Sequence, residues 1–401
     1  MLAERTTYVS ASATMAVAQA AKRLREQGID VIDLGAGEPD FPTPEHVKAA
    51  AMEAIRSDFT RYTPTAGISE LKQAIANRYL EDYGVTYSES ETIVTAGGKQ
   101  ALYNVALALF GRGDEVITSA PCWPTIFEQI KLAEAIPVMV RTYPEDGFKL
   151  HVEDVLNAVT PRTRGIILNS PGNPTGALIS EAELNEIADV AAKKDIWVVL
   201  DLCYERLIYD KVAHNLPGVL SDKLRNRSVL AGSASKAYAM TGWRCGWVLA
   251  PAEVVSACNA FQSHTTSNVC SITQKAVVAA LTGDQNCVTV MLDEFRKRRD
   301  TLLETLTSDS RIRCVKPSGA FYLFPDISEL LSSGGIRTSV DFAKELLEKG
   351  HVAVTAGEAF DAPGFVRISY ATSMDLLEQG AARILEFAES HGARETSSKA
   401  L

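Results

Sequence analysis

Short apolar runs rich in Val and Ile alternate with longer amphipathic stretches between residues 92 and 250 of this 401-residue chain. The runs predict strands at 92–95, 115–119, 137–141, 165–169, 197–201, 228–231 and 246–250. The stretches between them predict helices such as 99–110, 126–133 and 181–193. Strands that alternate with helices need crossover connections, which place helices on both faces of a parallel sheet. We therefore expect an α/β fold with a mostly parallel seven-stranded sheet.

The pattern changes after residue 250. Helices are expected at 252–262, 271–281 and 284–306, and the last of these is long and charged, like an arm that leaves the sheet domain. The remainder mixes strands at 320–324, 352–354 and 365–370 with helices at 339–349 and 374–389. This organisation predicts a large domain of residues 45–290 and a smaller α+β domain made of residues 1–44 and 291–401.

Charge and cysteine usage narrow the class of protein. The formal charge is −10, from 50 acidic and 40 basic residues, which argues against a wide nucleic-acid-binding face. The seven Cys form no C-x-x-C pair and the six His are scattered, so we expect no metal site. The start resembles no signal peptide and no apolar run approaches 18 residues, so we expect a cytoplasmic protein that does not interact with a membrane.

Two nucleotide-binding motifs fail. Gly-Gly-Lys at 97–99 is followed by Gln100, and Ile93 stands where a P-loop needs its first glycine. Gly35-Ala-Gly37 lies in an N-terminal turn and is followed by Glu-Pro-Asp, so it is not a dinucleotide fingerprint. The sequence therefore excludes a nicotinamide-dependent dehydrogenase.

Polar residues follow several predicted strands, at the edge of an open α/β sheet where ligands bind. Asp201 ends the apolar run IWVVLD. It is either a cap or loop acid, or a partly buried carboxylate that needs a cationic partner. Asn173 lies in the loop SPGNPTG after the strand at 165–169. Such rigid loops are mostly simple turns, but this one carries an amide side chain to the ligand-binding edge.

The segment SASKAYAMTGWR at 233–244 carries the strongest signal. A lone lysine is nearly always solvated, but the small and apolar residues around Lys236 predict partial burial. Burial lowers the pKa of an amine and makes it a nucleophile. Ser233, Ser235 and Arg244 together suit a phosphate, because an arginine can bind two of its oxygens at once.

Further positions have both a structural and a ligand-binding interpretation. Gly98 precedes the helix at 99–110, so its backbone N–H can face an anion. The side chain of Lys99 fits an anion site and an ordinary solvent-exposed position equally well. Trp123 follows a strand end and either packs in the core or stacks on a ligand. Arg367 alternates within a strand of the second domain and is either an outward-facing charge or a clamp for a carboxylate.

One ligand satisfies all of these positions, namely a phosphorylated pyridine aldehyde. It needs a lysine for an imine, a carboxylate for the ring nitrogen, a stacking ring, a phosphate cup and a donor to its phenolate. These are the protein partners expected of pyridoxal 5'-phosphate (PLP).

With these residues in place, the sequence resembles the class I, fold type I, PLP-dependent aminotransferases, and within them the bacterial aspartate aminotransferases of subgroup Ib. The resemblance extends from about Ser12 to Leu385 and is carried by SATMAV, GAGEPDF, YTPTAG, GGKQALYN, the Trp of PCW, NPTG, DLCY, SASKAYAMTGWRCGW, PSGAFY and VRISYATS. It implies the PLP-dependent transferase fold with a large PLP-binding domain and a smaller domain. It also implies a homodimer with active sites at the subunit interface.

The resemblance assigns roles at the matching positions. Lys236 would bind PLP covalently and act as the catalytic base, Asp201 would pair with the ring nitrogen, and Trp123 would stack on the ring. Asn173 and Tyr204 would bind the phenolate oxygen. The phosphate would be held by residues of both subunits, namely Ser233, Ser235, Arg244, the amide of Gly98 and Tyr62 of the partner subunit. The substrate α-carboxylate would be bound by Arg367, Asn173 and the backbone at Gly37.

The resemblance also bears on the substrate. In subgroup Ib a lysine in GGK and a threonine in SAT bind the distal carboxylate, and Lys99 and Thr14 match them. The segment FQSHTTSN at 261–268 lacks the arginine that the Ia branch uses instead. We therefore expect amino transfer from L-aspartate to 2-oxoglutarate by a ping-pong mechanism. Ser10 replaces a lysine found in members that accept prephenate. Alternatives on this fold are an aromatic, alanine or prephenate aminotransferase and, less favoured, a PLP-dependent lyase or a ligand-sensing regulator.

Overall fold

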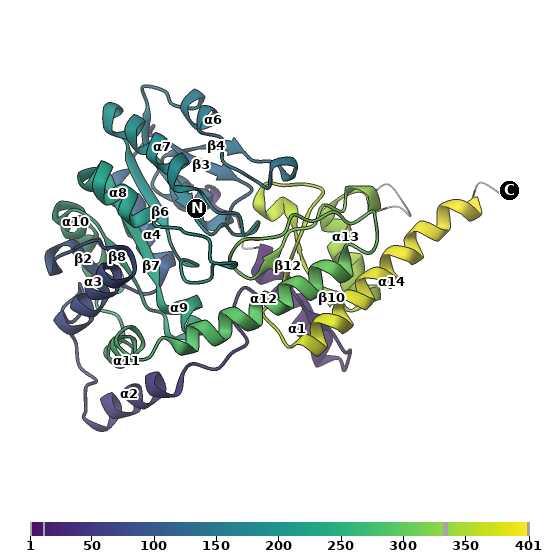
Figure 1. Cartoon of the computed structure of the whole chain (residues 1–401), viewed down its shortest axis with the longest axis horizontal. Helices are drawn as coiled ribbons and strands as arrows, with labels where there is room; N and C mark the ends of the chain where they lie inside the picture. The colour runs from purple at the N-terminus through teal and green to yellow at the C-terminus, as the bar shows by residue number, and fades with distance from the viewer. Residues whose placement is uncertain (1, 11–12, 332–335, 399–401) are drawn as a thin grey trace.

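A computed structural model of the chain describes residues 2–10, 13–331 and 336–398 (Figure 1). Its main element is a seven-stranded sheet in the order β2-β8-β7-β6-β5-β3-β4. Within this sheet β8 alone runs in the direction opposite to the other six strands. The strands are β2 (Thr92–Thr95), β3 (Glu115–Ala120), β4 (Ile136–Arg141), β5 (Thr163–Asn169), β6 (Trp197–Asp201), β7 (Ser228–Ser233) and β8 (Gly246–Leu249). All seven strands expected from the sequence are therefore confirmed, as is the mostly parallel sheet.

Helices cover both faces of this sheet (Figure 1). The helices of this part of the chain are α2 (Glu45–Arg56), α3 (Ser69–Tyr83), α4 (Gly98–Leu109), α5 (Pro124–Leu132), α6 (Val152–Asn157), α7 (Glu181–Lys194), α8 (Leu216–Leu224), α9 (Ala234–Ala237), α10 (Ala252–Ser263) and α11 (Ser271–Thr282). Of these, α2 packs on α11 and not on the strands. Alternate strand residues face opposite sides, as β geometry requires. Val198 and Leu200 of β6 belong to the core with α3, α7 and α8, while Trp197 and Val199 belong to the core with α4, α5 and α10.

A second group of elements packs around its own apolar core, which contains Phe295, Phe321 and Phe342. A parallel pair joins β1 (Ile32–Asp33) to β10 (Val352–Ala353), and an antiparallel sheet has the order β11-β12-β9. The remaining elements are β9 (Tyr322–Leu323), β11 (Thr355–Ala356), β12 (Val366–Ser369), α1 (Ala13–Glu26), α12 (Asn286–Leu306), α13 (Ser339–Glu345) and α14 (Met374–Ser398). Helix α12 crosses from the large sheet to this group, like the expected arm (Figure 1).

Three expected elements differ in detail. The helix expected at 374–389 continues to Ser398 as α14. The strand expected at 352–354 is two short strands, β10 and β11. The helix expected at 339–349 ends as α13 at Glu345 and continues as a π-helical turn, Leu346–Gly350. The domain boundaries at residues 45 and 290 stay a prediction. Among the described residues, no helix is both long enough and apolar enough to cross a bilayer.

Candidate active site

A cavity of about 460 Å³ lies where β5, β6 and β7 end. Because these strands are parallel, the polar residues that terminate them meet at one edge of the sheet. The described residues that line the cavity and were selected from the sequence are Gly37, Gly98, Lys99, Trp123, Asn173, Asp201, Tyr204, Ser233, Ser235, Lys236, Arg244 and Arg367. The fold therefore brings together residues that are up to 330 positions apart in the chain (Gly37 and Arg367).

Lys236 stands in α9, the short helix that follows β7 directly. The amine is partly buried and donates a hydrogen bond to the carbonyl oxygen of Gly37. Desolvation lowers the pKa of Lys236 to about 8 from its ordinary 10.5, because burial disfavours the charged form. A substantial share of the amine is then neutral near physiological pH, so it can act as a nucleophile or a base.

Asp201 is the last residue of β6, and its carboxylate is 2% exposed. Its Oδ1 accepts a hydrogen bond of 3.1 Å from the backbone N–H of Cys203. Burial raises the pKa of this carboxyl above its ordinary value, while Cys203 and Lys236 oppose the shift. No salt bridge reaches Asp201 from the described residues. A buried carboxylate in a cavity, without an ion-pair partner, suits a cationic ligand atom.

Arg367 of β12 is 2% exposed and points into the same cavity. One terminal nitrogen donates to Oδ1 of Asn173 at 3.1 Å, and the other donates to the carbonyl of Gly35 at 2.8 Å. Its Nε has no hydrogen-bond partner among the described residues. A buried guanidinium with an unused donor is suited to a planar carboxylate, since arginine binds such groups through two parallel hydrogen bonds.

The residues selected for a phosphate also come together. The hydroxyl of Ser233 lies 2.8 Å from that of Ser235, and Gly98 is the first residue of α4. Arg244 is held by the carbonyls of Thr241 and Ala96 at 2.8 and 3.3 Å. Two hydroxyls, a helix N-terminus and a guanidinium make an anion-binding group.

The glycine next to this group is required by packing. Gly97 has φ of +88°, and a Cβ built there would lie 2.5 Å from a terminal nitrogen of Arg244. Any side chain at this position would therefore displace the guanidinium.

Trp123 precedes α5, and its indole lies on the cavity wall. The amine of Lys99 lies 5.1 Å from the centre of this ring. Burial, and secondarily the charge of Arg244, lowers the pKa of Lys99. Lys99 is therefore close enough to the cavity to meet a negative group on a ligand.

Tyr322 of β9 is a wall residue that the sequence did not select. Its hydroxyl lies 2.8 Å from the hydroxyl of Tyr204, and its ring packs under the Arg367 guanidinium, 4.3 Å from the ring centre. Burial raises the pKa of both tyrosines, so both hydroxyls stay protonated. The only signal in the sequence was the PSGAFY segment, where an aromatic residue suggests core packing. Cys203 also lines the cavity.

Two selected residues are not placed at the cavity. Tyr62 is 92% exposed and does not line it. Thr14 lies in α1, but its side chain is outside the described part of the structure.

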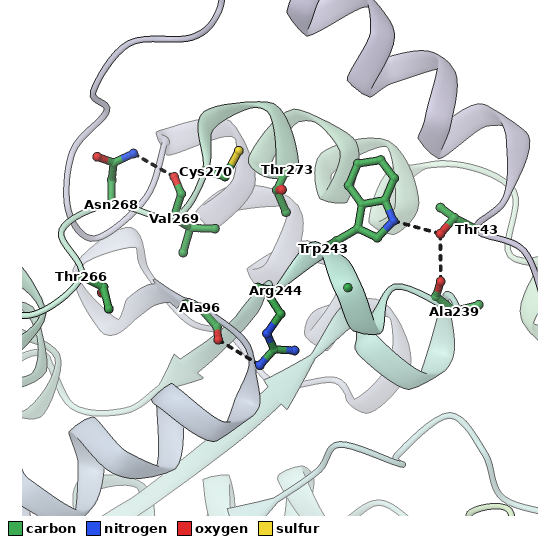
Figure 2. Close-up of a pocket in the computed structure, with 11 residues that line it drawn as sticks. Thr43, Ala96, Ala239, Trp243, Arg244, Thr266, Asn268, Val269, Cys270 and Thr273 are labelled. Atoms are coloured by element: carbon green, nitrogen blue, oxygen red, sulfur yellow. Dashed lines mark hydrogen bonds between the residues drawn. The ribbon is translucent and has the colours of Figure 1, made fainter. Parts of the chain in front are cut away.

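A second pocket of about 680 Å³ opens beside the anion-binding group. Arg244 lines both this pocket and the cavity. Figure 2 shows the Arg244 guanidinium with its hydrogen bond to Ala96, close to Trp243 and Thr273. The anion-binding group can therefore be reached from outside the cavity.

Comparison with known proteins identifies the family. The sequence pattern described as aminotransferase class I and II matches residues 29–384. The chain belongs to this family. The aminotransferase is 41% identical to the aspartate aminotransferase of Geobacillus stearothermophilus over 97% of its own length and 99% of the relative. It is 42% identical to the aspartate/prephenate aminotransferase of Cereibacter sphaeroides, over 94% and 96% of the two chains.

Solved structures give the same result for the fold of this aminotransferase. The aspartate aminotransferase of Thermus thermophilus with maleate superposes with a TM-score of 0.90 at 40% identity, covering 97% of this chain and 99% of the other. The expected fold type is therefore confirmed.

Proposed function

We propose that this aminotransferase uses PLP to move the amino group of L-aspartate to 2-oxoglutarate, which gives oxaloacetate and L-glutamate. The observation that carries the proposal is the arrangement of Lys236 and Asp201, a neutralisable amine and a buried carboxylate on the wall of one cavity. The aspartate aminotransferases at about 40% identity over nearly the whole chain support the choice of aspartate.

The residues present fit PLP. Lys236 would hold it covalently, Asp201 would face its ring nitrogen and Trp123 its ring face. Its phenolate would meet Asn173 and Tyr204. Its phosphate would meet the group of hydroxyls, backbone amide and guanidinium made by Ser233, Ser235, Gly98 and Arg244. When bound, the pyridine ring takes up the electron pair left behind when a proton leaves the substrate Cα.

The chain's own groups then have defined tasks. Once the substrate amine has displaced it, the amine of Lys236, whose pKa is lowered to about 8, would take the proton from the substrate Cα and deliver it to the imine carbon of the bound cofactor. The Asp201 carboxylate holds a proton on the ring nitrogen, because a buried negative charge favours the positive partner. Arg367 orients the substrate by binding its α-carboxylate. The phenol of Tyr204, which lines the cavity, would donate a hydrogen bond to the phenolate oxygen of the cofactor.

The substrate's second carboxylate is assigned to Lys99 and Thr14. Lys99 has the charge and lies beside Trp123 at the cavity, which favours a dicarboxylic amino acid over an apolar one. A prephenate aminotransferase is the second candidate, because relatives of comparable identity carry that name.

We further propose that the active unit is a homodimer. Tyr62 is almost fully exposed, and the pocket in Figure 2 offers open space next to Arg244. Tyr62 of the partner subunit would reach the phosphate through this pocket. A cytoplasmic location stays a prediction.

Steady-state kinetics with 2-oxoglutarate as acceptor tests the proposed function. Aspartate, phenylalanine, alanine and the amino acid formed from prephenate should be compared as donors to the PLP-loaded protein. We expect the highest kcat/KM with aspartate and parallel lines in double-reciprocal plots, the signature of a ping-pong mechanism. A donor panel in which phenylalanine or alanine exceeds aspartate would overturn the assignment.

A further inference from the structure

Asn169 is a buried amide that the proposed chemistry does not use. It is the last residue of β5, pairs in register with Asp201 of β6, and is 8% exposed. Asn169 lines the cavity and also a smaller one that Gly172 and Asn173 line as well. Asn169 therefore lies between Asp201 and Asn173, two residues with roles in the proposed function.

Both ends of the amide are used. The side-chain nitrogen donates to the carbonyl oxygen of Asp201 at 3.1 Å, and the side-chain oxygen accepts from the backbone N–H of Asn173 at 2.9 Å. The backbone carbonyl of Asp201 also accepts a hydrogen bond from the backbone N–H of Ser170, at 3.2 Å. The backbone N–H of Asn173, in contrast, donates to the side chain of Asn169. Loss of the amide would therefore release the Asn173 loop more than the end of β6.

The contacts continue beyond the loop. Oδ1 of Asn173 accepts from Arg367, which in turn donates to Gly35. A chain of hydrogen bonds thus runs from Asp201 through Asn169 and Asn173 to Arg367. It begins at the backbone carbonyl of Asp201, whose carboxylate is assigned to the cofactor, and ends at a guanidinium assigned to the substrate.

We propose that Asn169 is a positioning residue, whose amide fixes the Asn173 loop relative to Asp201 so that Asn173 and Arg367 meet the substrate carboxylate correctly. The proposal rests on the proposed function. The acceptor oxygen of the amide is the group that this role needs, because the Asp201 carbonyl that its donor meets also has a bond from Ser170. The effect falls on binding, since the carboxylate stays bound throughout the reaction.

The test measures binding without turnover. Maleate, a dicarboxylate without an amine, is titrated calorimetrically into PLP-loaded wild type, Asn169→Ala and Asn169→Asp. We expect Asn169→Ala to raise the Kd of maleate about tenfold, and the KM of aspartate by a similar factor, with kcat changed less than about threefold. Asn169→Asp keeps an oxygen acceptor for Asn173 N–H, so it should restore the Kd of maleate to within about threefold of wild type.

Asn104 provides the matched control. It is a fully buried asparagine of α4 whose amide donates to Gln262 at 3.0 Å, and it does not line the cavity. Asn104→Ala should lower the unfolding temperature and leave the Kd of maleate unchanged. Should Asn169→Ala fail to fold, Asn169→Gln keeps the amide but displaces it by one methylene, and the same tenfold weakening is expected.

The outcomes separate this proposal from the proposed function. If wild type binds PLP and maleate while every folded Asn169 variant keeps the wild-type Kd, the positioning role is wrong and the proposed function stands. If wild type itself takes up no PLP, the proposed function fails and this proposal fails with it.

Discussion

The hydroxyls of Tyr204 and Tyr322 lie 2.8 Å apart and join the loop after β6 to the small sheet across the cavity wall. Tyr204 follows Asp201 by three positions, whereas Tyr322 belongs to β9 and packs beneath Arg367. This contact therefore connects the part of the site assigned to the cofactor with the part assigned to the substrate.

Removing the Tyr322 hydroxyl should weaken catalysis without unfolding the chain. A neutral hydrogen bond contributes about 0.5–1.5 kcal/mol, so Tyr322→Phe should lower kcat/KM for aspartate by about 2- to 12-fold. Tyr209→Phe is the control, since the Tyr209 hydroxyl bonds to the Ala320 carbonyl in the core and does not line the cavity. It should lower stability and keep kcat/KM; an equal kinetic loss in both variants would contradict a role for the tyrosine pair.

The lowered pKa of Lys236 should be visible in the stability of the cofactor-free protein. The amine has a pKa of about 8 in the folded state and about 10.5 when unfolded, so between these values only the unfolded chain holds the proton. Raising the pH through this window therefore stabilises the folded state, by about 3 kcal/mol in total at 1.36 kcal/mol per unit. Below pH 8 the amine is charged in both states and the full penalty remains.

Urea unfolding of cofactor-free wild type and Lys236→Met, at one protein concentration and from pH 7.5 to 10, measures this effect. Wild type should gain stability relative to the variant as the pH rises. Parallel pH dependence in the two proteins would show that the amine is not desolvated. Other titrating groups cancel in the difference.

Lys99 should determine the preference for a dicarboxylic substrate. A hydrogen bond to a charged group contributes about 1.5–3 kcal/mol, so Lys99→Ala should lower kcat/KM for aspartate by about 12- to 160-fold. The value for alanine, which lacks the second carboxylate, should change less than about threefold. Lys131→Ala is the control, because Lys131 pairs with Glu128 on the outside of α5. Unchanged aspartate kinetics in Lys99→Ala would rule out the distal-carboxylate assignment.

Tyr62 should act across the dimer interface. If its hydroxyl reaches the phosphate in the other subunit, Tyr62→Phe should raise the Kd of PLP by about tenfold or more. Tyr143→Phe removes a hydroxyl from another exposed tyrosine and should leave this Kd unchanged. Sedimentation should give a dimer for both. If wild type sedimented as a monomer and still bound PLP tightly, this would contradict a phosphate site that two subunits share.

Much of the fold and site follows from local sequence. The seven strands could be predicted because each contains a short apolar run, and most of them are buried on both faces of the sheet. Asp201, Asn173 and Lys236 could be selected because they follow strand ends, and the carboxyl edge of a parallel sheet gathers such residues. The selection needed no knowledge of the distances between them.

The remaining features depend on contacts between distant segments. Tyr322 stands in a two-residue strand, too short for a periodic signal, and reaches the cavity only because β9 pairs with β12. In the sequence, Asn169 looks like any polar residue at the end of a strand. The positioning role proposed for it depends on one hydrogen bond to β6 and another to the loop that follows β5. The contact proposed for Tyr62 would lie in a second subunit, which a single chain's sequence does not place. The α13 boundary was missed because its last turn changes hydrogen-bond spacing, which apolar periodicity does not reveal.

The most direct test of the central claim is borohydride reduction of the PLP-treated protein followed by peptide mapping. Borohydride converts a carbon–nitrogen double bond between a lysine and PLP into a stable single bond. The account predicts a yellow protein that loses its visible band on reduction and carries the pyridoxyl label on Lys236, with no label in Lys236→Ala. A colourless protein, or a label on any other lysine, would contradict it.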